Sequence, residues 1–335
     1  MAFALPCVSL ASYPAGAGAS RDAGLASAWS DAMHTLGMLA ITDHGVSDAT
    51  IATLHSCALA FFRQPLDAKM AACVHSGYGS GGYVPQGVEA VARSTGDSRA
   101  PADAVESFVF NHGGDQRGDQ RDQDQHRTRT NPAEARLRDA VRDYWRQLEQ
   151  LLGLLMQLSA EALGYDGRFF EEYFDPPKCN LRLAYYAPPP AAAIEDVDSE
   201  QNSQAPQIER SNRSPQQRYG AHTDYTGFTI LRADAPGLQV QLSDGTWVSV
   251  SCPPNSLIVN AGDLIERWTN DLWRSPPHRV VFSPVERLSL VFFSGPKSTT
   301  KIEALPGTAT AERPSRYEPT TAGEHLYMKL KKSNV

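Results

Sequence analysis

The residues best suited to chemistry are His222 and Asp224, in the stretch "YGAHTDYTGFTIL" (219–231). The apolar pattern that follows them is typical of a β-strand. Residues i and i+2 of a strand point to the same face, so we expect both side chains to project together, with Thr223 facing away. A buried ionised carboxylate is unfavourable unless it is paired or bound to a cation. The pair therefore predicts two metal ligands that need a third.

A candidate third ligand is His278, which begins another predicted strand in "RSPPHRVVF". Two histidines and one carboxylate form the facial triad of non-haem Fe(II) oxygenases, which leaves three coordination positions open. The residues alone leave two alternatives open. The first is a structural His–Asp hydrogen bond, and the second is a zinc site of a hydrolase built from the same ligands.

A possible anion site follows in "RLSL", where Arg287 and Ser289 share one strand face. A guanidinium in an otherwise apolar strand is unfavourable unless it binds an anion, and a guanidinium beside a hydroxyl matches one carboxylate. The alternative is that Arg287 pairs with a surface aspartate. We expect this strand to neighbour the strand of His278.

The elements that position these residues differ between the two parts of the chain. Helical spacing or capping signals predict helices over 21–36, from Ser47 onward, from Pro65 onward and over 133–164. The segment "FALPCVSL" near the N-terminus and "MLAITDHGV" are predicted strands, and 76–88 is a predicted Gly-rich loop. From Asn180 onward the pattern becomes short strands separated by turn residues, which predicts a β-sandwich or barrel in one structural core.

Composition restricts the classes of partner. The chain has 335 residues and a formal net charge of −7, without a basic stripe that would favour nucleic acid. Its five cysteines are scattered and never form C-x-x-C, which favours reduced thiols in a cytosol. No apolar run approaches the roughly 20 residues of a membrane helix. We expect a cytoplasmic monomer without nucleic-acid or membrane partners.

The order of the motifs resembles the isopenicillin N synthase-like family of Fe(II)- and 2-oxoglutarate-dependent oxygenases. The similar segments are "LPCVSL", "GMLAITDHGV", "GGYVPQGVE", "LRLAYYAPPP", "AHTDYTGFTIL", "NAGDLIERWTNDLWRSPPHRV" and "RLSLVFF". They extend over nearly the whole chain. The resemblance implies an α+β fold, in which N-terminal and central helices brace a distorted double-stranded β-helix, or jelly roll.

The resemblance also implies roles for particular residues. Those that match the iron ligands are His222, Asp224 and His278. Those that match the 2-oxoglutarate site are Arg287 and Ser289, for the distal carboxylate, and Tyr186, which adds a hydroxyl. The chain departs from the family at Ala184, where an Asn is usual, and at Ala187, where a Pro is usual.

The implied activity is that of a dioxygenase that uses Fe(II), 2-oxoglutarate and O₂. It would hydroxylate, desaturate or cyclise a small molecule of specialised metabolism, with release of succinate and CO₂. Candidate substrate residues are Tyr83, Glu89, Arg93, Phe108, Arg182 and Tyr225. Arg182 and Arg93 suit a carboxylate-bearing substrate, with amino-acid-derived compounds among the candidates. The alternatives are an oxidase of the same fold that uses no 2-oxoglutarate, and a non-catalytic binding protein with a degenerate fold.

We expect one oxygenase domain over 1–335. Its predicted parts are an N-terminal helix and strand region (1–110), a polar insertion (112–132), a central helical segment (133–179), a jelly-roll core (180–300) that contains a second insertion (188–218), and a C-terminal extension (301–335).

Overall fold

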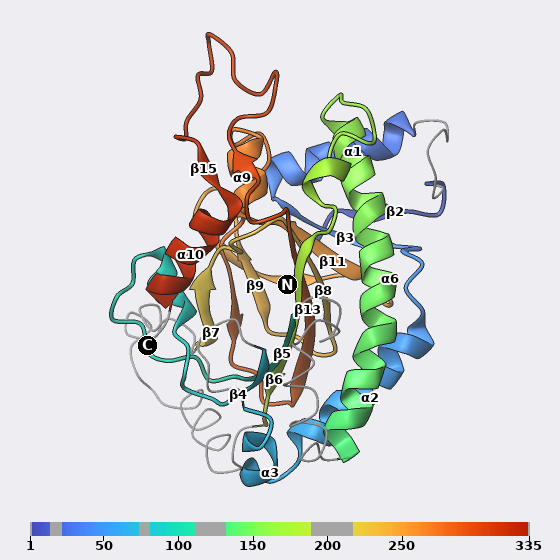
Figure 1. Ribbon diagram of the computed structural model, residues 1–335, viewed down its shortest axis with the longest axis vertical. Helices are drawn as coiled ribbons and strands as arrows, with labels where there is room; N and C mark the ends of the chain where they lie inside the picture. Colours follow the sequence, from blue (N-terminus) through green and yellow to red (C-terminus); the bar gives the residue numbers. More distant parts are fainter. Residues whose placement is uncertain (1, 14–21, 74–80, 112–131, 189–216, 334–335) are drawn as a thin grey trace, which may run out of the picture.

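The computed structural model describes residues 2–13, 22–73, 81–111, 132–188 and 217–333. The two predicted insertions, 112–132 and 188–218, lie almost entirely outside the described residues. Within the described parts the fold is α+β, as predicted, with two large β-sheets, one two-stranded sheet, and helices outside them (Figure 1).

The first sheet has five strands in the order β1-β10-β9-β12-β7. Their bounds are Phe3–Ala4 (β1), Trp247–Ser251 (β10), Leu238–Gln241 (β9), His278–Val281 (β12) and Gln217–His222 (β7). The second sheet has eight strands in the order β2-β3-β11-β8-β13-β6-β5-β4. Their bounds are Cys7–Ser9 (β2), Met38–Thr42 (β3), Leu257–Ala261 (β11), Phe228–Ala233 (β8), Arg287–Gly295 (β13), Lys178–Tyr186 (β6), Glu106–Asn111 (β5) and Gly82–Val84 (β4).

The two sheets pack face to face through apolar side chains. Val240 of the first sheet belongs to one buried cluster with Leu231 and Ile258 of the second. Val280 of the first sheet and Tyr186 of the second share another. Alternate residues of each strand therefore point into the space between the sheets, which is where the candidate site lies.

The N-terminal strand differs from its prediction. "FALPCVSL" is not one strand, because it divides at Pro6 into β1 of the five-stranded sheet and β2 of the eight-stranded sheet. Proline has no N–H to donate to a ladder, so the chain changes sheets there. The predicted loop 76–88 also differs, since Gly82–Val84 pairs with β5 as strand β4.

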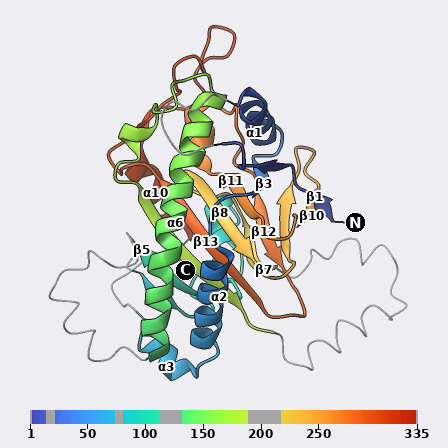
Figure 2. The same cartoon turned by 90° about the vertical axis from the view of Figure 1, so that its right-hand side faces the viewer.

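Helices cover the outer face of the eight-stranded sheet (Figures 1 and 2). They are α1 (Ala23–Thr35), α2 (Asp48–Phe62) and the long α6 (Pro132–Ala162). The short helix α3 (Leu66–Met70) follows α2 in the chain. The predicted N-cap of α2 is confirmed, because the Ser47 hydroxyl accepts a hydrogen bond from the Thr50 N–H. The apolar stripe of α6 packs on the sheet, for example through Trp145, whose ring meets Phe292 edge-on with centroids 5.2 Å apart.

The remaining elements are short. They are the helices α9 (Asp263–Trp268) and α10 (Ala322–Ser333), the 3₁₀ turns η1 (Val91–Thr95) and η2 (Glu171–Tyr173), and the paired strands β14 (Lys301–Ile302) and β15 (Thr320–Thr321). Helix α10 lies on the side of the sheets opposite α6 (Figures 1 and 2). The segment predicted only as a C-terminal extension thus ends in a helix that packs on the core.

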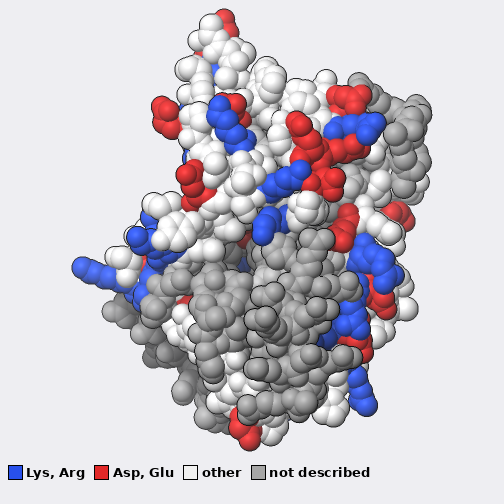
Figure 3. Space-filling view, viewed as in Figure 1, with Lys and Arg blue, Asp and Glu red and all other residues white. Residues whose placement is uncertain are grey.

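Two features of the described residues bear on partners. No helix among them combines the length and apolar character needed to cross a bilayer. On the face drawn in Figure 3, acidic and basic side chains are interspersed over the described surface.

Candidate active site

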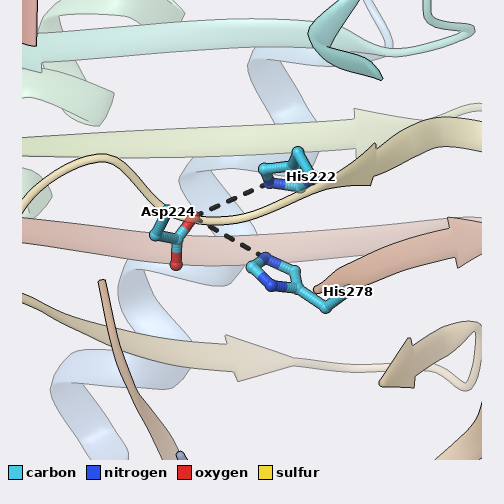
Figure 4. A group of neighbouring side chains, drawn as sticks. All are labelled: His222, Asp224 and His278. Atoms are coloured by element: carbon cyan, nitrogen blue, oxygen red, sulfur yellow. Dashed lines mark ion pairs between the residues drawn. The ribbon is translucent and has the colours of Figure 1, made fainter. Parts of the chain in front are cut away.

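The three predicted ligands meet at one point between the sheets (Figure 4). Nε2 of His222 and Nε2 of His278 each lie 3.6 Å from Oδ1 of Asp224. The three ligand atoms lie within 4.8 Å of one another, and no other such group of His, Cys, Asp or Glu occurs among the described residues. Ligand bonds of about 2.0–2.2 Å allow two ligands of one ion to be at most about 4.4 Å apart, so the two 3.6 Å separations fit a shared metal.

The backbone positions His222 and Asp224 differently from the prediction. Strand β7 ends at His222, so Asp224 lies in the turn after the strand and not on its face. Thr223 lines the same cavity as its two neighbours. His278 pairs directly with His222 across β12 and β7, which sets the two rings 4.3 Å apart.

Both imidazoles are held with Nε2 toward the centre. Nδ1 of His222 donates to the Gly220 carbonyl at 2.9 Å, and Nδ1 of His278 donates to the Pro276 carbonyl at 3.1 Å. Because a carbonyl only accepts, each Nδ1 carries the proton and each Nε2 presents a lone pair. This is the tautomer that a metal requires.

Two residues that the sequence analysis missed orient the carboxylate. Oδ2 of Asp224 accepts hydrogen bonds from the Thr229 hydroxyl at 2.6 Å and from the Asn260 side-chain amide at 2.7 Å. Oδ1 is thereby left to face the histidines. The available signal was a polar residue within each of two buried strands, "FTILRA" and "LIVNA".

The electrostatics keep Asp224 and His278 in metal-binding form. Burial alone would raise the pKa of Asp224, but the electrostatic influence of the neighbouring His278 and His222 and the hydrogen bond from Asn260 outweigh it and hold that pKa below its ordinary range. Burial, and then the neighbouring His222, lower the pKa of His278. The carboxylate is therefore ionised and His278 is neutral near pH 7.

The predicted anion site is buried on β13. Nη1 of Arg287 donates to the Ser289 hydroxyl at 2.5 Å, Nε donates to the Ala235 carbonyl at 3.2 Å, and the guanidinium lies 5.1 Å from the centre of the Tyr186 ring. Among the described residues, no carboxylate lies within ion-pair distance of Arg287, although its side chain is only 2% exposed. The alternative of a pair with a surface aspartate is therefore wrong within this part of the chain. Such a buried cation suits an anionic ligand.

The sheet assignment of this strand corrects another expectation. Strand β13 lies between β8 and β6 in the eight-stranded sheet, whereas β12, with His278, lies in the five-stranded sheet. Consecutive strands of a jelly roll alternate between sheets, so His278 and Arg287 come from opposite walls of the space and not from neighbouring strands.

A cavity of about 740 Å³ opens beside the histidines and Asp224. It is lined by four of the six predicted substrate residues, which are Tyr83, Glu89, Arg182 and Tyr225. The side chain of Tyr83 is engaged elsewhere, because its ring packs edge-on against Phe61, 6.0 Å between centroids, and its hydroxyl donates to Glu106 at 2.7 Å.

The cavity wall contains a charged pair, Glu89 and Arg182. Nη1 of Arg182 donates to Oε1 of Glu89 at 3.2 Å, Nη2 donates to Oε2, and both side chains are buried. The Arg182 guanidinium also stacks over the ring of Tyr219, 5.3 Å from its centre. Glu89 thus neutralises a cation that the sequence analysis assigned to a substrate carboxylate.

The other two predicted residues lie outside the cavity lining. Nε and Nη2 of Arg93 each donate to the Ala100 carbonyl at 3.2 Å, so the guanidinium has a structural role. Phe108 is fully buried against Phe61 and Phe110, on the side of the sheet that faces the helices. Strand alternation points its neighbour Val109 into the cavity instead, so the prediction chose the wrong face.

Known families match both parts of the chain. Residues 178–296 match the model of the 2OG-Fe(II) oxygenase superfamily, and residues 5–134 match that of the N-terminal region of non-haem dioxygenases in morphine synthesis. Both parts of the chain therefore match models of Fe(II)-dependent oxygenases, and the predicted recognition is confirmed at the level of the Fe(II)- and 2-oxoglutarate-dependent oxygenases.

Similar proteins agree with the family and the fold. Jasmonate-induced oxygenase 3 of Arabidopsis thaliana is 32% identical over 191 residues, which cover 55% of this chain and 47% of that protein. Gibberellin 2-beta-dioxygenase 1 of Oryza sativa subsp. japonica is 31% identical over 219 residues, which cover 60% and 57%. The chain thus spans about half the length of these curated relatives.

A solved structure extends the likeness over almost the whole chain. The full-length Neurospora crassa protein in complex with alpha-KG (2-oxoglutarate) and thymine superposes with a TM-score of 0.77 and 25% identity, over 98% of this chain and 96% of that one. This likeness confirms the predicted double-stranded β-helix.

Proposed function

We propose that the protein is an Fe(II)- and 2-oxoglutarate-dependent dioxygenase of a small molecule. The observation that carries the proposal is the convergence of two imidazole Nε2 atoms and one carboxylate oxygen within 4.8 Å, in a chain that matches the superfamily model. With O₂, Fe(II) and 2-oxoglutarate supply an oxidant that turns a substrate C–H into C–OH, or desaturates or cyclises the substrate, while 2-oxoglutarate leaves as succinate and CO₂.

The chain's own residues suit each part of this task. His222, Asp224 and His278 would hold the iron, and hydrogen bonds fix the orientation of all three. Arg287 and Ser289 would bind the distal carboxylate of 2-oxoglutarate, with Tyr186 beside them. These binding roles position the reactants and leave the oxidation itself to the bound metal and co-substrate.

The cavity supports a mainly apolar substrate with one polar end. Valines 84, 88, 91 and 109 and Leu264 line it together with the Glu89–Arg182 pair. A substrate carboxylate, which the sequence alone favoured, would have to displace Glu89 from Arg182. A neutral group that accepts from Arg182 and donates to Glu89 would not have to break the pair. The relatives named for jasmonate and gibberellin and the neighbour solved with thymine make small organic molecules the natural class to screen.

The test is a screen under air with Fe(II), 2-oxoglutarate and a panel of neutral and carboxylate-bearing small molecules, read by mass for products and succinate. Substrate-dependent succinate is the expected result. Product without succinate would favour the oxidase that uses no 2-oxoglutarate. Activity that survives without O₂ would favour a zinc hydrolase.

A non-catalytic protein is tested separately. Anaerobic Fe(II) plus 2-oxoglutarate should produce a weak visible charge-transfer band, and a chelator should abolish it. Absence of the band would favour a degenerate fold. The monomeric state also stays a prediction, which light scattering on the eluting protein tests.

A further inference from the structure

The C-terminal helix α10 contributes a wall to the cavity although the sequence analysis gave it no role. Ala322, Gly323, Leu326 and Leu330 all line the cavity. Leu326 and Leu330 are one turn apart on the same helix face, and both are half-buried. Tyr327 and Met328 point away from the protein, with 64% and 54% of their surfaces exposed. The helix thus presents an aliphatic edge to the cavity that holds the metal ligands.

A buried carboxylate ties this helix to the metal centre. Asp263 is 7% exposed, and its Oδ2 lies 2.6 Å from Nζ of Lys329 and 3.5 Å from Nε2 of His325, both on α10. Its Oδ1 accepts from the Ser275 hydroxyl at 2.9 Å. Its backbone N–H donates to the carbonyl of the predicted ligand Asp224 at 2.8 Å. One residue therefore contacts both the turn that carries a metal ligand and the helix that closes the cavity.

The backbone holds α10 at its two ends. At the start, the N–H groups of Ala322 and Gly323 donate to the carbonyls of Thr300 and Ser298 at 3.0 and 2.9 Å. At the end, the Ala90 N–H donates to the Ser333 carbonyl at 3.3 Å. Lys329 joins the helix to the core between these ends, and its ammonium also lies 5.5 Å from the centre of the Tyr225 ring. Loss of Lys329 would leave the buried Asp263 carboxylate without the positive charge that offsets its loss of hydration.

We propose that α10 is the substrate-selecting wall of the cavity, that Leu326 and Leu330 determine which apolar part of a substrate is accepted, and that the Asp263–Lys329 pair holds the wall closed. The selection rests on the proposed function, whereas the closure does not. The ligand class is a small molecule with a hydrocarbon portion that contacts both leucines. Asp263 is a positioning residue, because it acts through the helix.

Closure is tested by hydrogen exchange of the α10 amides in the full chain. Lys329→Met should speed exchange in α10 about ten-fold or more, because the helix opens locally more often. Lys331→Met is the matched control, since Lys331 is exposed on the same helix and should leave exchange unchanged. Lys329→Arg should restore slow exchange. Equal exchange in Lys329→Met and the unaltered protein would overturn the closure, whether or not any activity is found.

Selection is tested with the substrate panel. Leu326→Ala and Leu330→Ala should shift the ratio of kcat/KM between a bulkier and a smaller apolar compound by about ten-fold toward the bulkier one. Met328→Ala, on the exposed face, should leave the ratio unchanged. An unchanged ratio in both leucine variants of an active protein would overturn the selecting role. If the unaltered protein yields no product, the proposed function fails, and the exchange experiment still decides the closure.

Discussion

The two ends of the candidate site are built in different ways. At the metal end, the three ligands come from β7, the turn after it and β12, and the atoms that do not face the centre are fixed by hydrogen bonds. At the substrate end, the cavity wall comes from β4–β6, the segment around η1, and α10, which are far apart in the sequence. The difference indicates that the metal ligands depend on two adjacent strands, whereas the choice of substrate would depend on side chains that strands, a connecting segment and the last helix bring together from distant parts of the chain.

The largest expected effect is the loss of a metal ligand. His278→Ala should reduce iron binding and turnover below detection, because a facial triad reduced to two ligands no longer holds the ion. Metal content and succinate formation measure this, and circular dichroism checks the fold. His55→Ala is the control, since His55 pairs with Asp234 at 2.7 Å outside this cluster and should leave the iron content unchanged. Full iron content in His278→Ala would refute the ligand assignment.

A smaller effect is expected at the co-substrate site. Arg287→Ala removes a charge-assisted contact of about 1.5–3 kcal/mol, so the concentration of 2-oxoglutarate needed for half-maximal rate should rise about 10- to 150-fold. Arg232→Ala on the adjacent β8 is the control, because Arg232 faces the helix side and donates to the Ser256 carbonyl. An unchanged requirement in Arg287→Ala would show that the guanidinium has a different ligand.

The hydrogen bonds behind Asp224 should matter less than the ligands themselves. Thr229→Val removes one donor and should weaken iron binding about 10- to 100-fold while the fold is retained. Thr229→Ser keeps the hydroxyl and should bind iron normally. Competition with a calibrated chelator gives the affinity. Equal affinity in the Val and Ser variants would mean that Asn260 alone orients the carboxylate.

The sequence predicts the metal end of the site better than the substrate end. The ligand types, their spacing and the strands around them are local signals, so the metal triad and the Arg287–Ser289 pair could be found without coordinates. The cavity wall could not, because Glu89 and Arg182 are far apart in sequence and only the fold shows that they neutralise each other. Thr229 and Asn260 were missed because a residue that hydrogen-bonds to a metal ligand gives only a weak signal in the sequence. The signal is a single polar residue in an apolar strand. The role of α10 depends on long-range packing that no local pattern encodes.

The smallest effects are expected at two adjacent residues of β5, Phe108 and Val109. Phe108 lies on the helix side of the sheet, and Val109 lies in the cavity wall. Phe108→Leu should lower the free energy of unfolding by about 1–2 kcal/mol, because it leaves space against Phe61 and Phe110, and it should not alter substrate preference. Val109→Leu adds bulk to the cavity wall, so it should disfavour larger substrates with little loss of stability. Denaturant unfolding and the substrate panel measure the two quantities on both variants. The opposite pattern, with preference altered at 108 and stability lost at 109, would mean that β5 presents its other face to the cavity, as the sequence alone suggested.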